Sequence, residues 1–598
     1  MPCGLSIEEK SPSRCLALLW SAVVCLGTFI LFYWIWHRSI RPYYFPFTDD
    51  LSLIVNSTSP FHPRWTSWFL DGFKNYFDVY TESFVPYTNF IRPTVNLTYF
   101  LDYLAFGSNW SMYLLTTYGF VSIIAGTTSF IAYYFLRLGW RLILLTVICT
   151  VFAPSLTTAA FYYPSDGFDL LAGALVLLGV CALMSDAVVT AWIIFTIAAF
   201  TKETALFAPC FAAAIVFIRK DGKPLFWRGL WSASFLFPVC AWIALYWHDF
   251  RNKNGIYVLS LYSSTTTIAH KIITTIKGFA LWPIAAVNKT EYWHSSHVLL
   301  KVIFVLSLTF NMVTWLILLG GLIYIVRLRN GRINGLWQDI QESIRTSPIS
   351  IIAIFCIGSL LIPLALGLPN RFGGIFYPLF ALCLAFMARR GKYMFVRTYS
   401  ILMIAAIGIV GPTLIYADIA YYLPTFQGVW AMSKDYMDVL SKSKSPRVFV
   451  FDDVSGGYAA TENVRRFSGY KGNIVRLNDL LWNFMCPESA RIAIEKNLNG
   501  DLNLDSKVLR KCGEHDFNGL LLYDLSTPQF VVFERKIAGV VLKYRLVSHS
   551  DIQDSSLDSS DLHIVMHDNE PDDVIVIPNL ETRRYKEIKI DGKVDIRN

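Results

Sequence analysis

Long apolar segments recur along the chain, and short polar connections separate them. About eleven of these segments reach or approach the length of roughly 20 residues with which an α-helix crosses a bilayer. They cover approximately residues 15–36, 112–136, 142–161, 168–185, 187–201, 203–218, 229–247, 298–326, 348–366, 372–388 and 398–417. This pattern predicts a mainly α-helical, polytopic membrane protein with about 11 transmembrane helices.

The pattern changes after residue 417, where short β-like runs alternate with more helical stretches. The runs lie at 448–451, 520–523, 530–533 and 540–546. We therefore expect a transmembrane domain over 1–417 and a C-terminal α/β domain over 418–598. Cys486 and Cys512 are the only cysteines of the second domain. The sequence leaves open whether they form a disulfide or stay as two buried thiols.

The composition agrees with a membrane protein. Hydrophobic residues make up 54% of the 598 positions and charged residues 16%, whereas about a quarter of a soluble globular protein is charged. The net charge is +8, but the basic residues follow the connections between apolar segments. Nucleic acid is therefore not an expected partner.

Lysine and arginine alternate between connections in the way that sets the orientation of membrane helices. The basic connections lie at 137–141, 219–228, 327–345 and 389–397. Cytoplasmic connections carry the excess of Lys and Arg, so this set is expected in the cytoplasm. Residues 37–111 then form a large outer loop, and residues 418–598 form an extracytoplasmic domain.

A few charged residues fall on the outer side, where the topology disfavours cations. They are Asp49, Asp50, Arg92, Lys202, Glu203 and Arg371. In the connections 201–203 and 367–372 the cation is the only basic residue. We therefore expect acids and cations from distant parts of the chain to meet on one side of the membrane.

This combination suits the transfer of a sugar from a lipid-linked donor. A polyprenyl-phosphate sugar presents a phosphate at the membrane surface, and Arg or Lys can bind that phosphate and stabilise it as the leaving group. A carboxylate can take the proton of an acceptor hydroxyl. A second carboxylate beside it can orient the first, raise its pKa or bind a cation.

Each element also has a structural explanation. The acidic pair could cap a helix that begins near Leu51. Lys202 and Glu203 could be an interfacial pair whose long side chains reach toward water, and Arg371 could cap backbone carbonyls. We favour sugar transfer because all these residues fall on the same side of the membrane.

Four short motifs resemble those of GT-C-type glycosyltransferases, and they occur in the same order. The first, Phe47-Thr48-Asp49-Asp50, resembles the acidic motif at the start of their first outer loop. The other three are the stretch 92–107, similar to R-P-x-x-x-L-T-Y-x-L-D-Y-x-x-F-G, then Lys202-Glu203, similar to a K-E motif, and Arg371-Phe372, similar to a late R-[FY] motif. The resemblance covers about residues 15–417 and is to enzymes of the protein O-mannosyltransferase and lipid A aminoarabinose transferase type.

The resemblance implies a GT-C fold and an inverting transfer from a polyprenyl-phosphate-sugar donor to an extracytoplasmic glycan, lipid or protein. It implies that Asp49 is the catalytic base, while Asp50 orients it or binds a cation. A divalent cation, if the reaction uses one, would be held by this pair. Lys202, Arg371 and Arg92 are expected to bind the donor phosphate. Glu203 is expected to support them. The expected location is the bacterial inner (cytoplasmic) membrane, with the active site on its outer face.

Two other functions stay open on the sequence. A polymerase or ligase of surface polysaccharide would use a lipid pyrophosphate donor and outer-loop arginines, which leaves the acidic pair without a role. A transporter or flippase would need ionisable groups near the middle of the spans. The apolar segments of this chain have almost none there.

Overall fold

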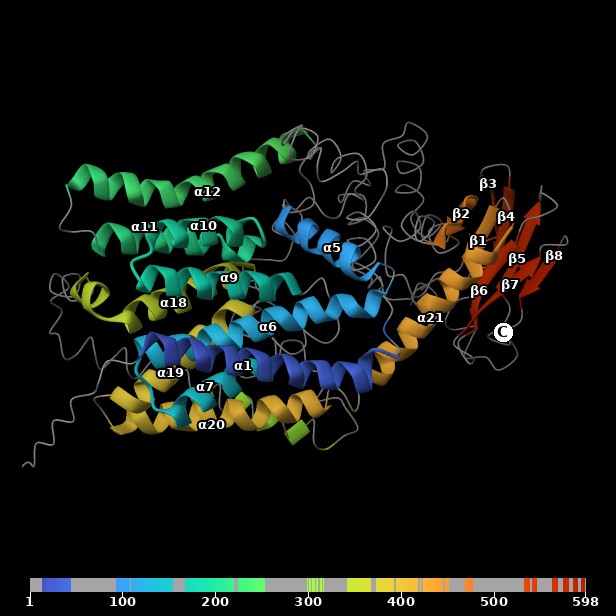
Figure 1. Cartoon of the computed structure of the whole chain (residues 1–598). Coiled ribbons are helices and arrows are strands. Elements are labelled where there is room, and N and C mark those ends of the chain that lie inside the picture. The colour runs from blue at the N-terminus through green and yellow to red at the C-terminus, as the bar shows by residue number, and fades with distance from the viewer. Residues whose placement is uncertain are drawn as a thin grey trace, which may run out of the picture. The chain divides into compact units, whose positions relative to one another are not determined.

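A computed structural model gives the architecture of the chain (Figure 1). The residues that it describes are 13–42, 44, 93–107, 109–153, 167–219, 224–252, parts of 298–316, 341–366, 373–391, 394–417, 420, 423–444, 447–450, 468–476, 532–537, 540–545, 562–567, 574–579, 584–589 and 593–596. They fall into two compact units, the first holding the helices up to α20 and the second the residues from Thr425 onward. Each unit is described by itself.

The first unit is helical. Its longer helices are α1 (Arg14–Ile35), α5 (Pro93–Phe106), α6 (Tyr113–Phe130), α7 (Trp140–Val151), α9 (Gly167–Met184), α10 (Val188–Ala199), α11 (Phe207–Arg219), α12 (Leu225–Asn252), α18 (Pro348–Leu366), α19 (Gly373–Arg390) and α20 (Met394–Ala417). Short turns extend or precede them: the π-helical η1 (Trp36–Ile40) and η3 (Ile131–Phe135), and the 3-10 turns η2 (Trp110–Met112) and η5 (Glu203–Ala205).

Four helical stretches of the described part are long and apolar enough to cross a membrane. They are Arg14–Ile40, Trp110–Phe135, Gly167–Met184 and Val396–Thr413. Large apolar side chains cover the outside of α1 and α12, for example Leu26, Phe226 and Phe237, each more than 60% exposed. Such a surface is suited to lipid rather than water. The described part is thus mainly helical, as expected for a membrane protein, and the count of eleven spans stays a prediction.

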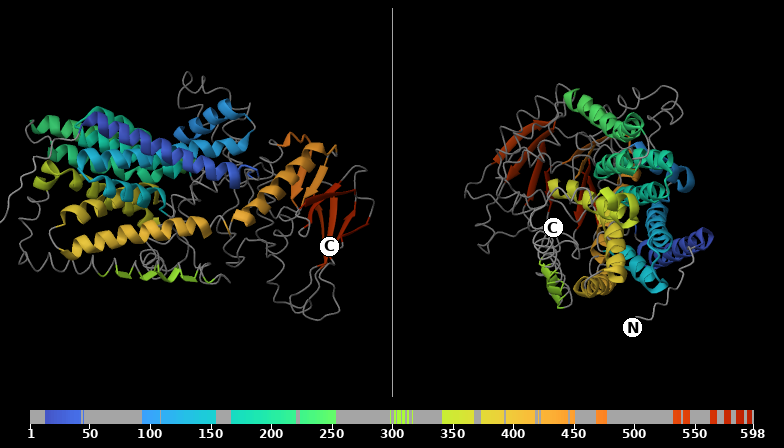
Figure 2. Two further views of the ribbon diagram at one scale, coloured as in Figure 1. Left: turned by 60° about the horizontal axis from the view of Figure 1, so that its bottom comes forward. Right: turned by 90° about the vertical axis from the view of Figure 1, so that its left-hand side faces the viewer.

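The helices pack through small residues. α6 packs against both α1 and α9, and α9 packs in turn against α10 and α19 (Figures 1 and 2). The Ser21 hydroxyl of α1 donates a hydrogen bond to the Gly126 carbonyl of α6 at 2.8 Å. Gly173 of α9 faces Gly374 of α19, and a Cβ built on Gly173 would lie 2.5 Å from the Gly374 carbonyl oxygen. Glycine allows these helix backbones to approach closely, as is common in membrane bundles.

Arginines gather at one end of this bundle, where α9, α11 and α19 finish. Four of them donate to carbonyl oxygens in or near the last turns of these helices. The pairs are Arg219 to Leu183, Arg228 to Phe217, Arg345 to Ile218 and Arg397 to Ala388. A helix C-terminus carries partial negative charge, which favours cations. We call Arg219, Arg228, Arg345 and Arg397 the basic rim.

The second unit contains eight strands and helix α21 (Leu423–Lys442), which belongs to this unit from Thr425 onward. The strands are β1 (Arg447–Val450), β2 (Asn473–Arg476), β3 (Val532–Ile537), β4 (Val540–Arg545), β5 (Leu562–His567), β6 (Val574–Asn579), β7 (Arg584–Lys589) and β8 (Lys593–Ile596). They form two four-stranded sheets, ordered β2-β1-β6-β7 and β3-β4-β5-β8. In the first sheet β1 runs parallel to β2 and β6, and the second sheet is antiparallel.

The expected runs 448–451, 530–533 and 540–546 overlap β1, β3 and β4, whereas 520–523 lies outside the described residues. Cys486 and Cys512 also lie outside them. The independent α/β domain over 418–598 and the boundary at residue 417 therefore stay predictions.

The contact between α9 and α19 gives a first testable prediction. We expect Gly173→Ala to lower the free energy of unfolding by about 1–3 kcal/mol, because the added methyl group overpacks a backbone contact. Thermal unfolding of the detergent-solubilised protein measures this change. Gly119→Ala in α6 is the matched control, since a Cβ there meets no atom within 4 Å. A Gly173→Ala protein as stable as the parent would contradict the close approach of the two helices.

Candidate functional site

A buried ion pair lies at the end of the bundle opposite the basic rim. Asp169 is in the first turn of α9, and Lys202 directly precedes η5 in the connection between α10 and α11. The Lys202 Nζ lies 3.4 Å from the Asp169 Oδ2, and the two side chains are only 9% and 5% exposed. The first turn of a helix stabilises a carboxylate. The 18 residues of α9 separate this pair from the basic rim by about 27 Å, close to the thickness of a hydrocarbon core.

Several elements meet around the ion pair. Gly374, in the first turn of α19, is so close to α9 that a Cβ on it would lie 2.8 Å from the Asp169 carbonyl oxygen. Gly167 faces Thr117 of α6 in the same manner. The Tyr99 ring of α5 packs edge-on against Phe168, with ring centres 5.3 Å apart. We call this end of the bundle, with Asp169 and Lys202 at its centre, the site end.

A second buried carboxyl group, Asp102, lies on α5. Thr116 of α6 donates a hydrogen bond from its Oγ1 to the Asp102 Oδ1, and Asp102 is 7% exposed. Burial raises the pKa of Asp102 to about 7, although the hydrogen bond from Thr116 acts to lower it. α5 lies outside the four described stretches that are long and apolar enough to cross a membrane, and it precedes the one that begins at Trp110. Asp102 can therefore exchange a proton near neutral pH.

The described segments before and after residues 45–92 are both fixed to the start of α6. The Trp36 Nε1 at the end of α1 donates to the Ser111 carbonyl at 3.0 Å. Asp102 of α5 accepts from Thr116, five residues further along. The loop that carries the acidic pair therefore begins and ends beside the same few residues.

Four of the predicted site residues, Asp49, Asp50, Arg92 and Arg371, lie outside the described residues. Their predicted roles stay predictions. Among the described residues, no group of three or more His, Cys, Asp and Glu side chains could hold a metal ion. Because the acidic pair is not among them, the expected cation site is untested by this result.

The other two predicted residues, Lys202 and Glu203, are described. Glu203 is half-buried and begins η5. Lys202 is buried and pairs with Asp169, a partner that sequence reasoning did not find. The sequence did offer a signal: Asp169 is an aspartate at the start of an otherwise uncharged apolar segment, and the connection before it has no basic residue. Asp102 occurred in the sequence analysis only as the acid of the L-D-Y motif, and no role was predicted for it.

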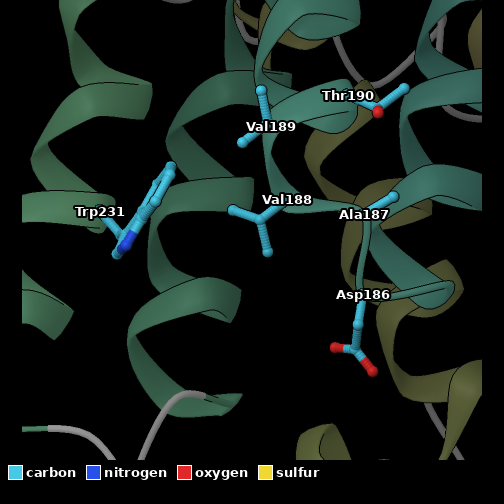
Figure 3. Close-up of a pocket in the computed structure, with 6 residues that line it drawn as sticks. All are labelled: Asp186, Ala187, Val188, Val189, Thr190 and Trp231. Atoms are coloured by element: carbon cyan, nitrogen blue, oxygen red, sulfur yellow. The ribbon is translucent and has the colours of Figure 1, made fainter.

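A separate pocket of about 330 Å³ lies near the basic rim, where α10 begins (Figure 3). It is lined by Asp186, Ala187, Val188, Val189, Thr190 and Trp231. The Val188 side chain points toward Trp231, and the Asp186 carboxylate points away from both. Asp186 pairs with Arg219 at 3.4 Å, and its side chain is 62% exposed. The only charged side chain that lines this pocket is Asp186, and Arg219 neutralises it. The site end is therefore the better candidate for a functional site.

Comparison of the chain with protein-family models, with curated proteins and with solved structures found no match. The residues and their arrangement are therefore the basis from which a function is inferred.

The buried Asp102 predicts a pH dependence of stability. The folded-state pKa is raised above the ordinary value of 3.8 to about 7. Protonated Asp102 therefore contributes to the free energy of unfolding. This contribution is complete below about pH 4 and is lost as the pH rises to about 7. We expect the melting temperature of the parent protein to fall between pH 5 and pH 8, and to fall less in Asp102→Asn, whose amide oxygen can still accept from Thr116.

Thr116→Val is the companion variant. It removes the donor that favours the ionised carboxylate, so its destabilisation should be larger at pH 8 than at pH 5. Thermal unfolding at the two pH values measures both effects. Identical pH profiles for the parent and Asp102→Asn would show that Asp102 does not titrate in this range.

Proposed function

We propose that the chain is a GT-C-type membrane glycosyltransferase, which moves a sugar from a polyprenyl-phosphate-linked donor to an extracytoplasmic glycan, lipid or protein. The observation that carries the proposal is the buried Asp169–Lys202 pair at the site end. A charged pair is costly to bury, so its presence where several helices converge favours a functional site.

The order of the motifs supports the same proposal. Pro93, the second residue of the R-P motif, begins α5. Lys202 of the K-E motif belongs to the ion pair. Arg371 precedes Gly374, whose backbone contacts Asp169, by three residues. Three motifs that are far apart in the sequence thus belong to, or directly adjoin, elements of the site end.

The distribution of arginine supports an outward orientation of the site end. By the positive-inside rule, the basic rim faces the cytoplasm. The site end then faces the outer side, where a lipid-linked sugar would meet an extracytoplasmic acceptor. The bacterial inner membrane, about eleven spans and an extracytoplasmic α/β domain over 418–598 complete the proposal.

The proposed reaction is a single inverting displacement. Asp49 takes the proton of the acceptor hydroxyl while the oxygen attacks the anomeric carbon on the face opposite the phosphate. The bond from that carbon to the phosphate oxygen breaks, and the polyprenyl phosphate leaves with the electron pair. Arg371, Arg92 and Lys202 compensate the charge that develops on the phosphate, and Asp169 holds Lys202 in place.

The placement of charge favours an enzyme over a transporter. In the four described spans, the Asp, Glu, Lys and Arg residues lie at the ends: Asp169 in a first turn, and Arg14, Arg38 and Arg397 near span termini. A transporter of polar cargo would place ionisable groups near the bilayer midplane.

Replacing the acidic pair tests the proposed chemistry. Asp49→Asn keeps the size of the side chain and much of its capping ability but cannot accept a proton. We expect turnover to fall by roughly a hundred-fold to ten-thousand-fold, measured as sugar transfer or donor hydrolysis with a panel of polyprenyl-phosphate sugars. Asn caps a helix about as well as Asp, so near-normal turnover in both Asp49→Asn and Asp50→Asn would reduce the pair to a helix cap.

A double-mutant comparison tests Lys202. Asp169→Asn and Lys202→Met alone should each be destabilising, by about 3–5 kcal/mol, because each leaves a buried charge without its partner. The double variant should regain most of this stability, because no charge is left buried. If Lys202 contacts the donor phosphate, the double variant should still use the donor poorly, with a raised KM, even though its stability is restored. Normal donor kinetics in the double variant would limit Lys202 to compensating Asp169.

A further inference from the structure

The site end of α1 carries one histidine and two arginines that the proposed reaction does not use. They are His37, Arg38 and Arg41, which we call the α1 basic cluster, and all three side chains are exposed. They lie in and just after the π-helical turn that extends α1. Since 37, 38 and 41 are one to four residues apart, they lie on neighbouring parts of the helix surface.

Each arginine of the cluster lies over a tryptophan. The Arg38 guanidinium is 5.2 Å from the centre of the Trp34 ring, and the Arg41 guanidinium is 5.4 Å from that of Trp36. Trp36 is itself fixed, because it is fully buried and its Nε1 donates to the Ser111 carbonyl. Cation–π contacts hold a guanidinium in place while leaving its N–H groups free to donate.

His37 contacts one of the two arginines and an aromatic ring of α1. The His37 ring stacks on Tyr33, with ring centres 6.1 Å apart and planes 14° apart. Its Nδ1 lies 3.4 Å from the Arg41 Nη1. Within the described part of the chain, neither Arg38 nor Arg41 is paired with a carboxylate. Among the residues that the structure describes, the positive charge of Arg38 and Arg41 is thus not compensated by a carboxylate.

This charge stands on the disfavoured side of the first span. Lys10 and Arg14 precede the span, whereas Arg38 and Arg41 follow it. The two flanks carry the same number of basic residues, so the first span gains no orientation from them. The orientation of the span therefore does not explain why Arg38 and Arg41 follow it, and another role for them is expected.

The order of side chains along α1 matches the layers of a bilayer. Exposed Leu26 and Ile30 come first, then exposed Tyr33 and Trp34, and then the α1 basic cluster. Aromatic rings prefer the boundary between hydrocarbon and head groups. Arg38 is one helical turn beyond Trp34, or about 6 Å at 1.5 Å per residue. The backbone of Arg38 and Arg41 thus lies beyond the aromatic rings, where lipid head groups are expected, and both guanidinium groups lie beside these rings.

We propose that the α1 basic cluster is a binding site for the phosphate of an anionic membrane phospholipid. Arg38 and Arg41 donate charge-assisted hydrogen bonds to the phosphate oxygens, a geometry for which guanidinium is well shaped. Tyr33 and Trp34 contact the lipid at the upper part of its acyl chains. The proposal does not rest on the glycosyltransferase function, because it concerns exposed residues on the lipid-facing side of α1.

Lipid binding to the purified full-length protein tests the site. The protein, held in phosphatidylcholine, is titrated with phosphatidylglycerol, and bound lipid is counted by native mass spectrometry. We expect the Arg38→Gln/Arg41→Gln variant to bind phosphatidylglycerol roughly tenfold or more weakly than the parent, since each basic residue near anionic lipid contributes substantially to binding. Phosphatidylcholine binding should stay the same.

Arg141→Gln is the matched control. Arg141 is exposed and lies 5.4 Å from the ring centre of Trp140, so it repeats the arginine-on-tryptophan contact, and Arg137, four residues before it, lies outside helix α7. We expect less than a twofold change in this variant. Equal losses in the control and the double variant would show general electrostatic attraction and overturn the proposal, as would an unchanged affinity in the double variant.

Two further measurements distinguish a lipid from free phosphate and a specific loss of binding from misfolding. Inorganic phosphate at the concentration of the lipid should not compete; competition as strong as that of added lipid would overturn the assignment to a membrane phospholipid. Arg38→Lys/Arg41→Lys keeps the charge but loses the fork of donors, so it should bind with intermediate affinity. Because the readout is lipid binding, its failure is distinguishable from a failure of sugar transfer.

Discussion

The apolar outer surface of the helices confines charge to the two ends of the described bundle. Hydrocarbon offers no partner for a charged or unpaired polar group, so a spanning helix can carry such groups only near its termini or toward a protected interior. At one end the basic rim donates to the last carbonyls of α9, α11 and α19. At the other end Asp169 and Lys202 neutralise one another. In the four described spans, the charged side chains accordingly lie near the ends.

The site end is held by contacts that depend on each other. Asp169 needs Lys202, because either charge alone would be costly at this degree of burial. The position of Asp169 depends in turn on the close approach of α9 and α19, which a side chain at Gly173 or Gly374 would prevent. A charged pair is therefore placed by backbone contacts between helices, and small residues decide how well it is positioned.

The start of α6 organises the surroundings of this pair. Ser111 accepts from Trp36 of α1, Thr116 donates to Asp102 of α5, and Thr117 faces Gly167 of α9. Three helices are thus tied to two turns of a fourth. Trp36 serves twice, since its indole nitrogen anchors α1 and its ring supports Arg41 of the α1 basic cluster. The Trp36 side chain therefore contacts both the α1 basic cluster and the start of α6.

The sequence by itself determined the class of protein and the positions of several helices, because apolar length and periodicity are local properties that a bilayer rewards directly. The predicted segments 15–36, 112–136 and 168–185 agree closely with α1, α6 and α9. It also singled out Lys202, as an isolated cation in a connection where Lys and Arg are disfavoured.

Only the tertiary structure decided what Lys202 contacts. Its partner, Asp169, is 33 residues away, and the intervening α9 and α10 must pack antiparallel before the two charges meet. The same holds for Asp102 and Thr116, and for Gly173 and Gly374. A single sequence records the type of each residue but not the crossing of helices, and burial, pairing and pKa all follow from that crossing.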